Sequence, residues 1–299
     1  VVSIVLLVAG IAFFVERGKA RYDIDFNGGI MVQVETGEAM STAEVRKALK
    51  ETGYREVQIQ SYIGSGEGVG KSRKFALRVD PTTYDSDLSR TQFKKDFEAA
   101  IRTALNLGEG GITKVRDIGP TVAGEMWRKA ALALFLGLLA ILVYIRLRFA
   151  EFTFGLGAVA ALVHDVVIAT GLFVFWGYFS GGKIDLTIVA GLLTIVGYSI
   201  NDTIVVFDRI RENVRRDKRS SISDLVNASI NQTLSRTIWT SFTTFIVVLT
   251  LFLAGGSVLH GFAFIMIVGV VVGTYSSIFI ASPVMIRLHK KLHSSSSAG

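Results

Sequence analysis

Long apolar runs recur along this chain, separated by short polar segments. Five of them lie near residues 130–145, 152–179, 184–207, 237–254 and 261–286, and another occupies residues 1–15. A helix needs ~20 predominantly apolar residues to cross the hydrocarbon core of a bilayer. In lipid, an apolar helix satisfies all of its backbone hydrogen bonds internally. The pattern therefore predicts an α-helical polytopic membrane protein with six transmembrane helices.

The two ends of the chain need separate treatment. The sequence does not start with methionine, and we expect it to start inside the first transmembrane helix. A cleaved signal peptide is the rival interpretation, but no small-residue cleavage site precedes Glu16 and Arg17. Residues 294–299, rich in serine, are expected to form a flexible tail.

The positions of the basic residues predict how the helices are oriented. They follow the second, fourth and sixth apolar runs: Arg146 and Arg148; Arg209, Arg211, Arg215, Arg216, Lys218 and Arg219; Arg287, Lys290 and Lys291. The opposite short loops contain only Lys183. Because cytoplasmic loops are enriched in Lys and Arg, both termini are predicted to be cytoplasmic. The expected division is residues 1–15 as the first span, 16–128 as an extracytoplasmic domain, 129–286 as the other five helices with a cytoplasmic loop over 208–235, and 287–299 as a cytoplasmic tail.

The external segment has the alternation of a small soluble domain. A strand is expected over 22–35, followed by a helix that Ser41 opens with Glu44 as its capping box. Strands over 56–63 and 74–79, a helix over 89–107 and a strand over 113–118 follow. This β-α-β-β-α-β order is that of an α+β ferredoxin-like domain. The glycines between the middle strands, Gly64, Gly66, Gly68 and Gly70, lack a strand-turn-helix context, so we interpret them as a hairpin tip and not as a nucleotide loop.

The second helix of that domain, 89–107, has a regular apolar face. Its bulky side chains recur every four residues, at Phe93, Phe97, Ile101 and Leu105. This spacing places them on one side of a helix, where they are expected to form the core of the domain.

Composition narrows the class of function. Half of the 299 residues are hydrophobic and only 19% are charged, which indicates that lipid is the solvent for much of the chain. There is no cysteine, so disulfides and thiolate metal sites are excluded. The net charge of +7 comes from basic runs beside apolar spans, which favours membrane orientation over nucleic-acid binding. No nucleophile-base pattern and no metal cluster among the four histidines is evident, so neither an enzyme nor a metal site is expected.

Three ionisable residues within the apolar runs are candidates for function. Each costs at least ~2.5 kcal/mol near the centre of a membrane helix and so needs a partner or a task. Asp165 lies midway along the third run beside His164, and Asp202 lies in the fourth, ~9 Å before the helix leaves the membrane. Arg236 opens the fifth run. We expect these residues to mark a polar path inside the bundle.

The fifth run adds a polar stripe at helical spacing. Thr233, Arg236, Thr240 and Thr244 recur every three or four residues, and Asn201 adds a further polar position beside Asp202. An ion pair or a proton relay between Asp202 and Arg236 is one interpretation; a structural hydrogen bond for Asp202 and a snorkelling Arg236 is the other. The role of Asp165 stays open, because adjacent residues of a helix do not share a face.

Several motifs resemble one known family. Residues 197–213 are similar to the fourth-span signature of SecF, a long and specific match. Further matches are Asp25, Gly28 and Gly29 in residues 25–29, then residues 119–122, 161–166 and 232–237. Together they cover essentially the whole chain. The one departure within these motifs is Asn27, where many members have threonine.

The resemblance implies a function and partners. It implies a subunit of the SecDF complex of bacterial protein export, in the resistance-nodulation-division (RND) superfamily, located in the inner membrane. Its partners would be SecD, the SecYEG translocon, YidC, YajC, the translocating preprotein and membrane lipid. Protons would be the coupling ion, with no other cofactor. By motif, Asp202 resembles the proton-carrying aspartate of the family and Arg236 its essential arginine.

Two other functions compete with this interpretation. One is a proton-driven RND exporter of small molecules or lipids, which the modest size of the external domain argues against. The other is a scaffold that holds the translocon together without titrating. Proton flux in an Arg236→Ala variant would separate the scaffold from a transporter.

Overall fold

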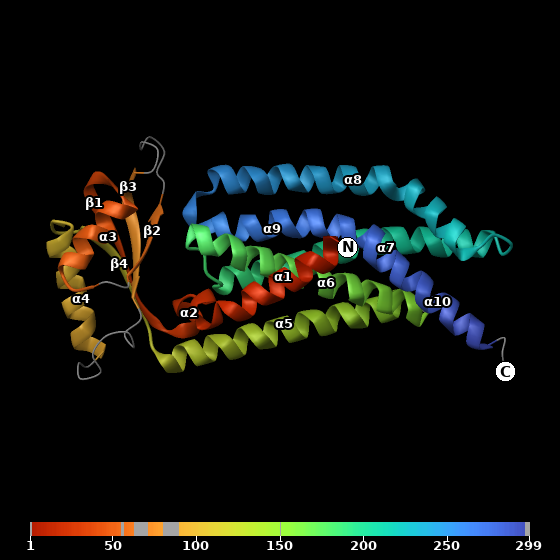
Figure 1. The fold of residues 1–299 in the computed structure, drawn as a ribbon, viewed down its shortest axis with the longest axis horizontal. Coiled ribbons are helices and arrows are strands. Elements are labelled where there is room, and N and C mark those ends of the chain that lie inside the picture. The colour runs from red at the N-terminus through yellow and green to blue at the C-terminus, as the bar shows by residue number, and fades with distance from the viewer. Residues whose placement is uncertain (1, 55–56, 63–70, 80–89, 150, 297–299) are drawn as a thin grey trace.

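The computed structural model describes residues 2–54, 57–62, 71–79, 90–149 and 151–296. The molecule is elongated, with a small sheet domain at one end and a bundle of long helices at the other (Figure 1). The predicted glycine-rich hairpin tip, residues 64–70, lies outside the described residues. We call the α+β part at one end of the molecule the outer domain and the helical part the bundle.

The bundle contains five helices that are long and apolar enough to cross a membrane. Its elements are α1 (Val2–Glu16), α5 (Pro120–Arg148), α6 (Phe152–Ser180), α7 (Leu186–Arg216), α8 (Ile222–Ala254), α9 (Gly256–Ser276), a π-helical turn (Ser277–Ala281) and α10 (Ser282–Ser296). The helix α1 has 15 residues. At 1.5 Å per residue it is ~22 Å long, against the ~30 Å of a hydrocarbon core. Within the described residues, five spans of the predicted six therefore meet the length requirement.

Two segments differ from the sequence-based expectation. The predicted cytoplasmic loop over 208–235 is mostly helical, because α7 continues to Arg216 and α8 starts at Ile222. No glycine or proline interrupts this stretch, and the Ser221 side chain caps α8 by accepting a hydrogen bond from the Asp224 amide. The predicted flexible tail is also helical as far as Ser296, since α10 follows the π-helical turn directly.

The outer domain is a four-stranded antiparallel sheet with two helices. Its elements are β1 (Gly29–Ser41), α3 (Thr42–Glu51), β2 (Gln58–Tyr62), β3 (Lys71–Val79), α4 (Arg90–Ala104) and β4 (Ile112–Ile118), and the strand order is β2-β3-β1-β4. The β-α-β-β-α-β order of the elements agrees with the prediction. The capping box of α3 is present, with Ser41 and Glu44 exchanging hydrogen bonds of 3.2 and 2.6 Å.

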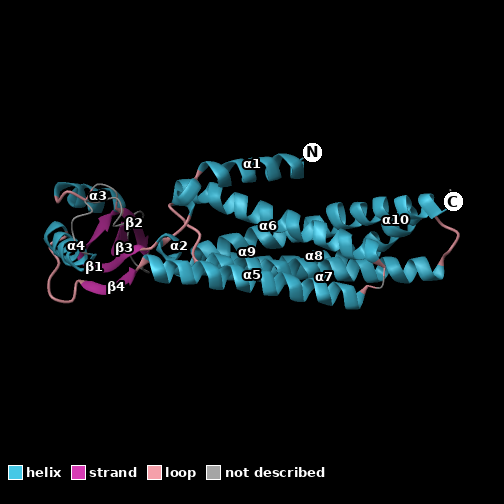
Figure 2. Ribbon diagram, turned by 90° about the horizontal axis from the view of Figure 1, so that it is seen from below, coloured by secondary structure: helices cyan, strands magenta, loops and turns pink. Residues whose placement is uncertain are grey.

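The core of this domain lies between one face of the sheet and its two helices. The predicted face of α4 is buried at all four positions, Phe93, Phe97, Ile101 and Leu105. These side chains pack against Phe75 and Leu77 of β3 and against the β1 valines. The opposite face of the sheet, away from α3 and α4, is turned toward the outer end of the bundle (Figure 2).

The first strand starts later than predicted. Residues 22–28 were expected to be extended, but they contain the short helix α2 (Ile24–Asn27), and β1 begins at Gly29. Gly28 and Gly29 have φ values of 75° and 140°, which residues with a side chain rarely adopt. A Cβ atom at Gly29 would also lie 2.9 Å from the Val79 carbonyl oxygen. These two family-motif glycines therefore form the corner between α2 and β1.

Glycines allow the closest helix contacts in the bundle. A Cβ atom at Gly269 of α9 would lie 2.2 Å from the Ile195 side chain of α7, and one at Gly273 would lie 3.1 Å from Ser199. Gly10 of α1 and Gly171 of α6 touch in the same way. Such contacts are typical of membrane helices, where small residues let backbones approach closely.

Candidate functional site

Asp202 lies in a buried polar contact among three helices. It is 3% exposed, on α7, and its Oδ2 accepts a hydrogen bond of 3.2 Å from the Ser241 hydroxyl of α8. The Ser241 oxygen in turn accepts from the Tyr198 hydroxyl at 3.2 Å and from the Thr274 hydroxyl of α9 at 2.7 Å. A change in the charge of this carboxylate would therefore alter the hydrogen bonds that join α7, α8 and α9.

The expected ion pair between Asp202 and Arg236 is not formed in this structure. No salt bridge within 4.0 Å joins these two described residues, and Arg236 is exposed. Arg236 is five residues from Ser241 along α8, which corresponds to ~7.5 Å of helix rise, so it lies nearer the start of α8 than the Ser241 hydroxyl that bonds to Asp202.

The predicted polar stripe of α8 is divided between buried and exposed positions. Thr233 is buried, Thr244 is half-buried, and Thr240 is exposed. Each of these hydroxyls donates to a carbonyl of its own helix, at Ser229, Thr240 and Arg236 respectively. The hydroxyl donors of these threonines are therefore satisfied within α8. Asn201, beside Asp202, is exposed as well.

Asp165 is the most deeply buried carboxylate of the bundle, with an exposure of 0%. Its Oδ2 accepts hydrogen bonds from the Ser199 hydroxyl of α7 at 2.5 Å and the Ser276 hydroxyl of α9 at 2.6 Å. Its Oδ1 lies 2.9 Å from Nδ1 of His164. The carboxylate thus joins α6, α7 and α9 at one point.

The contact between His164 and Asp165 corrects an expectation drawn from helix geometry. Adjacent residues are ~100° apart around a helix, which suggested that these two would not meet. The imidazole ring instead reaches back across this angle to the carboxylate. The other ring nitrogen, Nε2, is buried and has no hydrogen-bond partner among the described residues.

Sequence reasoning missed the hydroxyl groups that hold both carboxylates. Ser199, Ser241, Thr274 and Ser276 are small hydroxyl residues within the apolar runs, and such hydroxyls commonly bond to their own helix. The sequence offered one signal: Ser199 lies three residues before Asp202, and this spacing places both residues on one side of α7. Which hydroxyl faces which acid depends on how the helices cross, and this is not encoded locally.

A second set of charged contacts joins the outer domain to the bundle. Asp25, the acidic residue of the 25–29 motif, pairs with Arg116 of β4 at 2.9 Å and accepts a hydrogen bond of 3.4 Å from the Leu186 amide at the start of α7. Asp23 pairs with Arg78 of β3 at 3.2 Å. The Asp23 amide also donates to the Ile184 carbonyl at 2.9 Å. The start of α7 is therefore tied to the sheet through Asp25 of α2.

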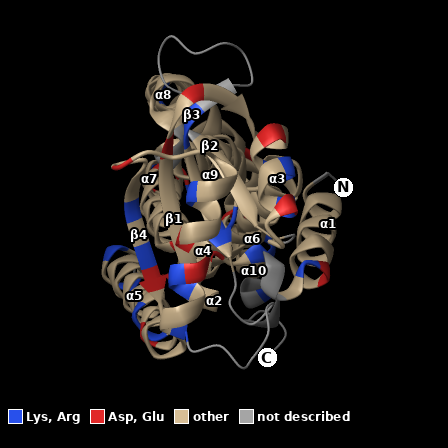
Figure 3. Cartoon of the chain, turned by 90° about the vertical axis from the view of Figure 1, so that its left-hand side faces the viewer, with Lys and Arg blue, Asp and Glu red and all other residues tan. Residues whose placement is uncertain are grey.

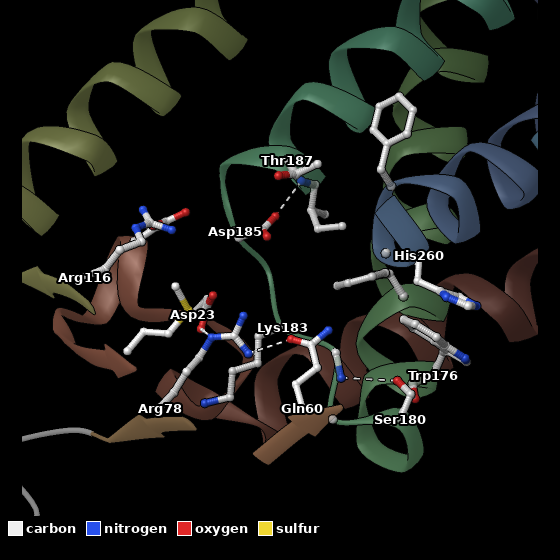
Figure 4. Close-up of a pocket in the computed structure, with 18 of the residues that line it drawn as sticks. Asp23, Gln60, Arg78, Arg116, Trp176, Ser180, Lys183, Asp185, Thr187 and His260 are labelled. Carbon is white, nitrogen blue, oxygen red and sulfur yellow. Dashed lines mark hydrogen bonds and ion pairs between the residues drawn. The ribbon is translucent and has the colours of Figure 1, made fainter. Parts of the chain in front are cut away.

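A cavity of about 330 Å³ lies within this junction, between the sheet and the outer ends of α6, α7 and α9 (Figure 4). Asp185 faces it and caps α7 by accepting a hydrogen bond of 2.9 Å from the Ile188 amide. Burial raises the pKa of Asp185 above its usual value, and the nearby Asp23 and Asp25 carboxylates raise it further. Within the described ranges, no three His, Asp or Glu side chains gather as a metal site would require.

Comparisons with known proteins agree over nearly the whole chain. A family model described as "Protein export membrane protein SecD/SecF, C-terminal" matches residues 99–291. The protein translocase subunit SecF of Vibrio alginolyticus is 39% identical over 285 residues, covering 95% of this chain and 85% of that protein. SecF of Rhodothermus marinus is 41% identical over 294 residues, covering 97% of this chain and 90% of that protein.

Solved structures give the same result for the fold. The crystal structure of SecDF, a translocon-associated membrane protein from Thermus thermophilus, superposes with a TM-score of 0.80 at 34% identity. The match covers 97% of this chain but only 37% of that longer one. SecDF in a "Super-membrane-facing form" superposes less closely, with a TM-score of 0.69 at 33% identity. With the family model and relatives of this similarity in agreement, the chain belongs to the SecF family of protein-export membrane proteins.

Proposed function

We propose that this chain pairs with SecD in a SecDF complex and uses the proton-motive force to promote movement or release of preproteins at the SecYEG translocon. The observation that carries the proposal is Asp202, a buried carboxylate that is hydrogen-bonded across α7 and α8 in a protein of the export family. A buried acid in a membrane helix is expensive, and proton transfer is the task for which such acids are commonly kept.

The proposed cycle starts with protonation of Asp202. A neutral carboxyl group accepts a weaker hydrogen bond from Ser241 than a carboxylate does, so the contact between α7 and α8 loosens. In a second arrangement of these helices, Arg236 approaches Asp202 and favours release of the proton. One charge crossing 100 mV supplies ~2.3 kcal/mol, which biases a two-state helix contact but does not unfold a protein in one step. Repeated cycles are therefore needed.

Asp165 has a second role in this proposal. Its contacts with Ser199, Ser276 and His164 support a carboxylate that shares the proton path with Asp202 through helices α7 and α9. Protons are the only coupling ion we assign, and we assign no enzymatic activity. YidC, YajC and membrane lipid complete the proposed set of partners.

We further infer the topology in the membrane. The helix α1 counts as a sixth span, packed on α6, and the outer domain is ferredoxin-like. The basic residues at the ends of α5 and α7 and within α10 support a cytoplasmic location for both termini and an extracytoplasmic location for the sheet domain in the bacterial inner membrane.

The decisive experiment replaces Asp202 by asparagine in the complex with SecD, reconstituted in vesicles with the translocon. Asp202→Asn keeps the size and hydrogen-bonding capacity of the side chain but removes its titration. We expect normal assembly and loss of the export stimulation that a proton gradient provides. The matched control is Asp208→Asn on the same helix, an acid paired with Arg148 near the cytoplasmic end. Undiminished stimulation in Asp202→Asn would leave only the scaffold function.

A further inference from the structure

The two edges of the outer sheet are built differently. The edge strand β4 contains Lys114, Arg116 and Asp117, and Figure 3 shows both basic and acidic positions along this strand. Its pairing with β1 is shifted between Gln33 and Val34. Charged side chains and bulges are the usual devices that stop an edge strand from pairing with another chain. This edge is therefore protected.

The opposite edge strand, β2, lacks these devices. Its sequence, Gln58–Tyr62, contains no charged residue and no proline, and its pairing with β3 proceeds without a register shift from Gln58 opposite Arg78 to Tyr62 opposite Lys74. Among the described residues, β3 is the only strand that pairs with β2. Backbone donors and acceptors along its outer side are thus available to a further strand.

A cleft of about 900 Å³ runs along this edge. Successive residues of a strand point to opposite faces of the sheet. Ile59 packs on the helix-covered face, whereas Gln60 accepts a hydrogen bond from Arg78 on the other face, yet both residues and Ser61 line the same cleft. Residues from both faces meet one cleft only if it follows the edge of the strand.

The other wall of the cleft comes from the outer end of the bundle. Trp176, Tyr178 and Phe179 of α6 line it, and the last two are 67% and 72% exposed. Arg46 of α3 adds a positive charge to the cleft, and no Asp or Glu is among its described lining residues. The cleft thus offers aromatic surface to apolar side chains, and this arginine favours neutral or acidic segments over basic ones.

We propose that the outer edge of β2 binds an extended, unfolded polypeptide segment of neutral or acidic character, which adds to the sheet as a further strand. Backbone hydrogen bonds along β2 would recognise such a segment largely independently of its sequence, while alternate side chains rest on the aromatic wall. A lipid cannot supply the alternating donors and acceptors that a strand edge requires. The inference rests on the proposed export function and adds the place where the moving chain is held outside the membrane.

Because the chain has no cysteine, a single engineered thiol can test this site. The full chain, in its complex with SecD in vesicles, carries Ser61→Cys on β2 or, as the matched control, Thr113→Cys on β4. The probes are a series of unfolded synthetic peptides of alternating valine and threonine, each with one glutamate and one cysteine. The position of the cysteine moves by one residue from each peptide to the next. We expect disulfide yields at Ser61 about fivefold above those at Thr113, alternating between strong and weak along the peptide as a paired strand requires.

The control is conservative, because Thr113 is more exposed than Ser61 and accessibility alone would favour it. Equal yields at the two edges, or yields at Ser61 that do not alternate, would overturn the docking site. So would a dominant disulfide between two Ser61→Cys copies, which would assign the edge to self-association. The adducts should persist in an Asp202→Asn background. Loss of docking and loss of proton-driven export can therefore be told apart.

Discussion

The two acids of the bundle, Asp165 and Asp202, have different surroundings. Asp165 is completely buried and has three side-chain partners from three helices. Asp202 has one hydrogen bond, to Ser241, at a longer distance of 3.2 Å. An acid with several short hydrogen bonds is held in one arrangement, whereas an acid with one long bond changes partners at lower cost. Protonation of Asp202 is therefore expected to shift its neighbouring helices more readily than protonation of Asp165.

Removing the Ser241 hydroxyl should therefore weaken the contact between α7 and α8. In Ser241→Ala the buried Asp202 carboxylate loses its hydrogen-bond donor, and we expect the free energy of unfolding to fall by about 1–3 kcal/mol. The measurement is reversible unfolding in mixed micelles. Thr250→Ala is the control, because this exposed α8 hydroxyl only donates to Ile246 of its own helix. Equal losses in the two variants would show that Ser241 does nothing specific for Asp202.

Asp185 gives a prediction about pH. Burial raises its folded-state pKa above the 3.8 of an ordinary aspartate. As pH rises from 3.8 through the folded-state pKa, the folded protein therefore gives up a proton that it holds more tightly than the unfolded chain, and stability falls. Asp185→Asn retains a capping oxygen for α7 and cannot ionise. We expect this variant to be more stable than the native chain at neutral pH, with the advantage shrinking in acid. Thermal unfolding against pH measures it, and a constant difference at every pH would refute it.

At the scale of residues, sequence reasoning located the ionisable groups but not their partners. Asp165 and Asp202 are conspicuous because each interrupts an apolar run, and Arg236 because it stands at the start of one. The sequence could not show that Ser241 bonds to Asp202. Which residue of α8 lies level with Asp202 depends on how α7 and α8 are offset along their axes, and this offset is known only from the structure. The predicted pairing of Asp202 with Arg236 did not take into account that Ser241, the residue of α8 that bonds to Asp202, lies five positions beyond Arg236.

Among the helices, the crossing of α1 and α6 is the closest backbone contact that glycine makes possible. A Cβ atom at Gly171 would lie 2.4 Å from the Cα atom of Gly10, which is backbone and cannot swing aside. We expect Gly171→Ala to push α1 away and to reduce the free energy of unfolding by about 1–3 kcal/mol.

The same substitution elsewhere supplies the control for α1. A Cβ atom at Gly124 of α5 would have no neighbouring atom within 4 Å among the described residues, so Gly124→Ala should be neutral or stabilising by up to ~1 kcal/mol through helix propensity. Both variants can be compared by unfolding in mixed micelles. If Gly171→Ala behaved like Gly124→Ala, α1 would not be packed on α6 in the membrane.

Element prediction succeeded where a single periodic signal was long. The apolar runs gave the membrane helices, and the capping box at Ser41 and Glu44 gave the start of α3. It was wrong over 22–28, where the glycines that end α2 look from sequence like an ordinary interruption of a strand. It also ended the fourth and started the fifth helix too near the membrane, because hydrophobicity marks where lipid ends and not where a helix ends.

For the molecule as a whole, α7 connects the two regions of interest. It begins at the junction with the outer domain, next to Asp185, and reaches Asp202 after 17 residues, a distance of ~26 Å along the helix axis. If α7 moves as a stiff unit, as the proposed cycle requires, a shift that starts at Asp202 would be transmitted to the Asp25 contact at the other end of the helix. The strand edge at β2 belongs to the sheet that this contact holds.

Breaking the junction should therefore separate the outer domain from events in the membrane. In Asp25→Asn the pairing with Arg116 is lost and the acceptor for the Leu186 amide is weakened. A loss of about one to two kcal/mol in the free energy of local opening corresponds to about 5–30-fold faster hydrogen exchange for amides around 184–188. Exchange near Asp202 should be unchanged. Proton-driven export should fall even though Asp202 is intact. Asp117→Asn is the matched control, because its pairing with Arg90 lies wholly within the outer domain. If export were fully retained in Asp25→Asn despite the faster exchange, α7 would not be the route by which the membrane acts on the sheet.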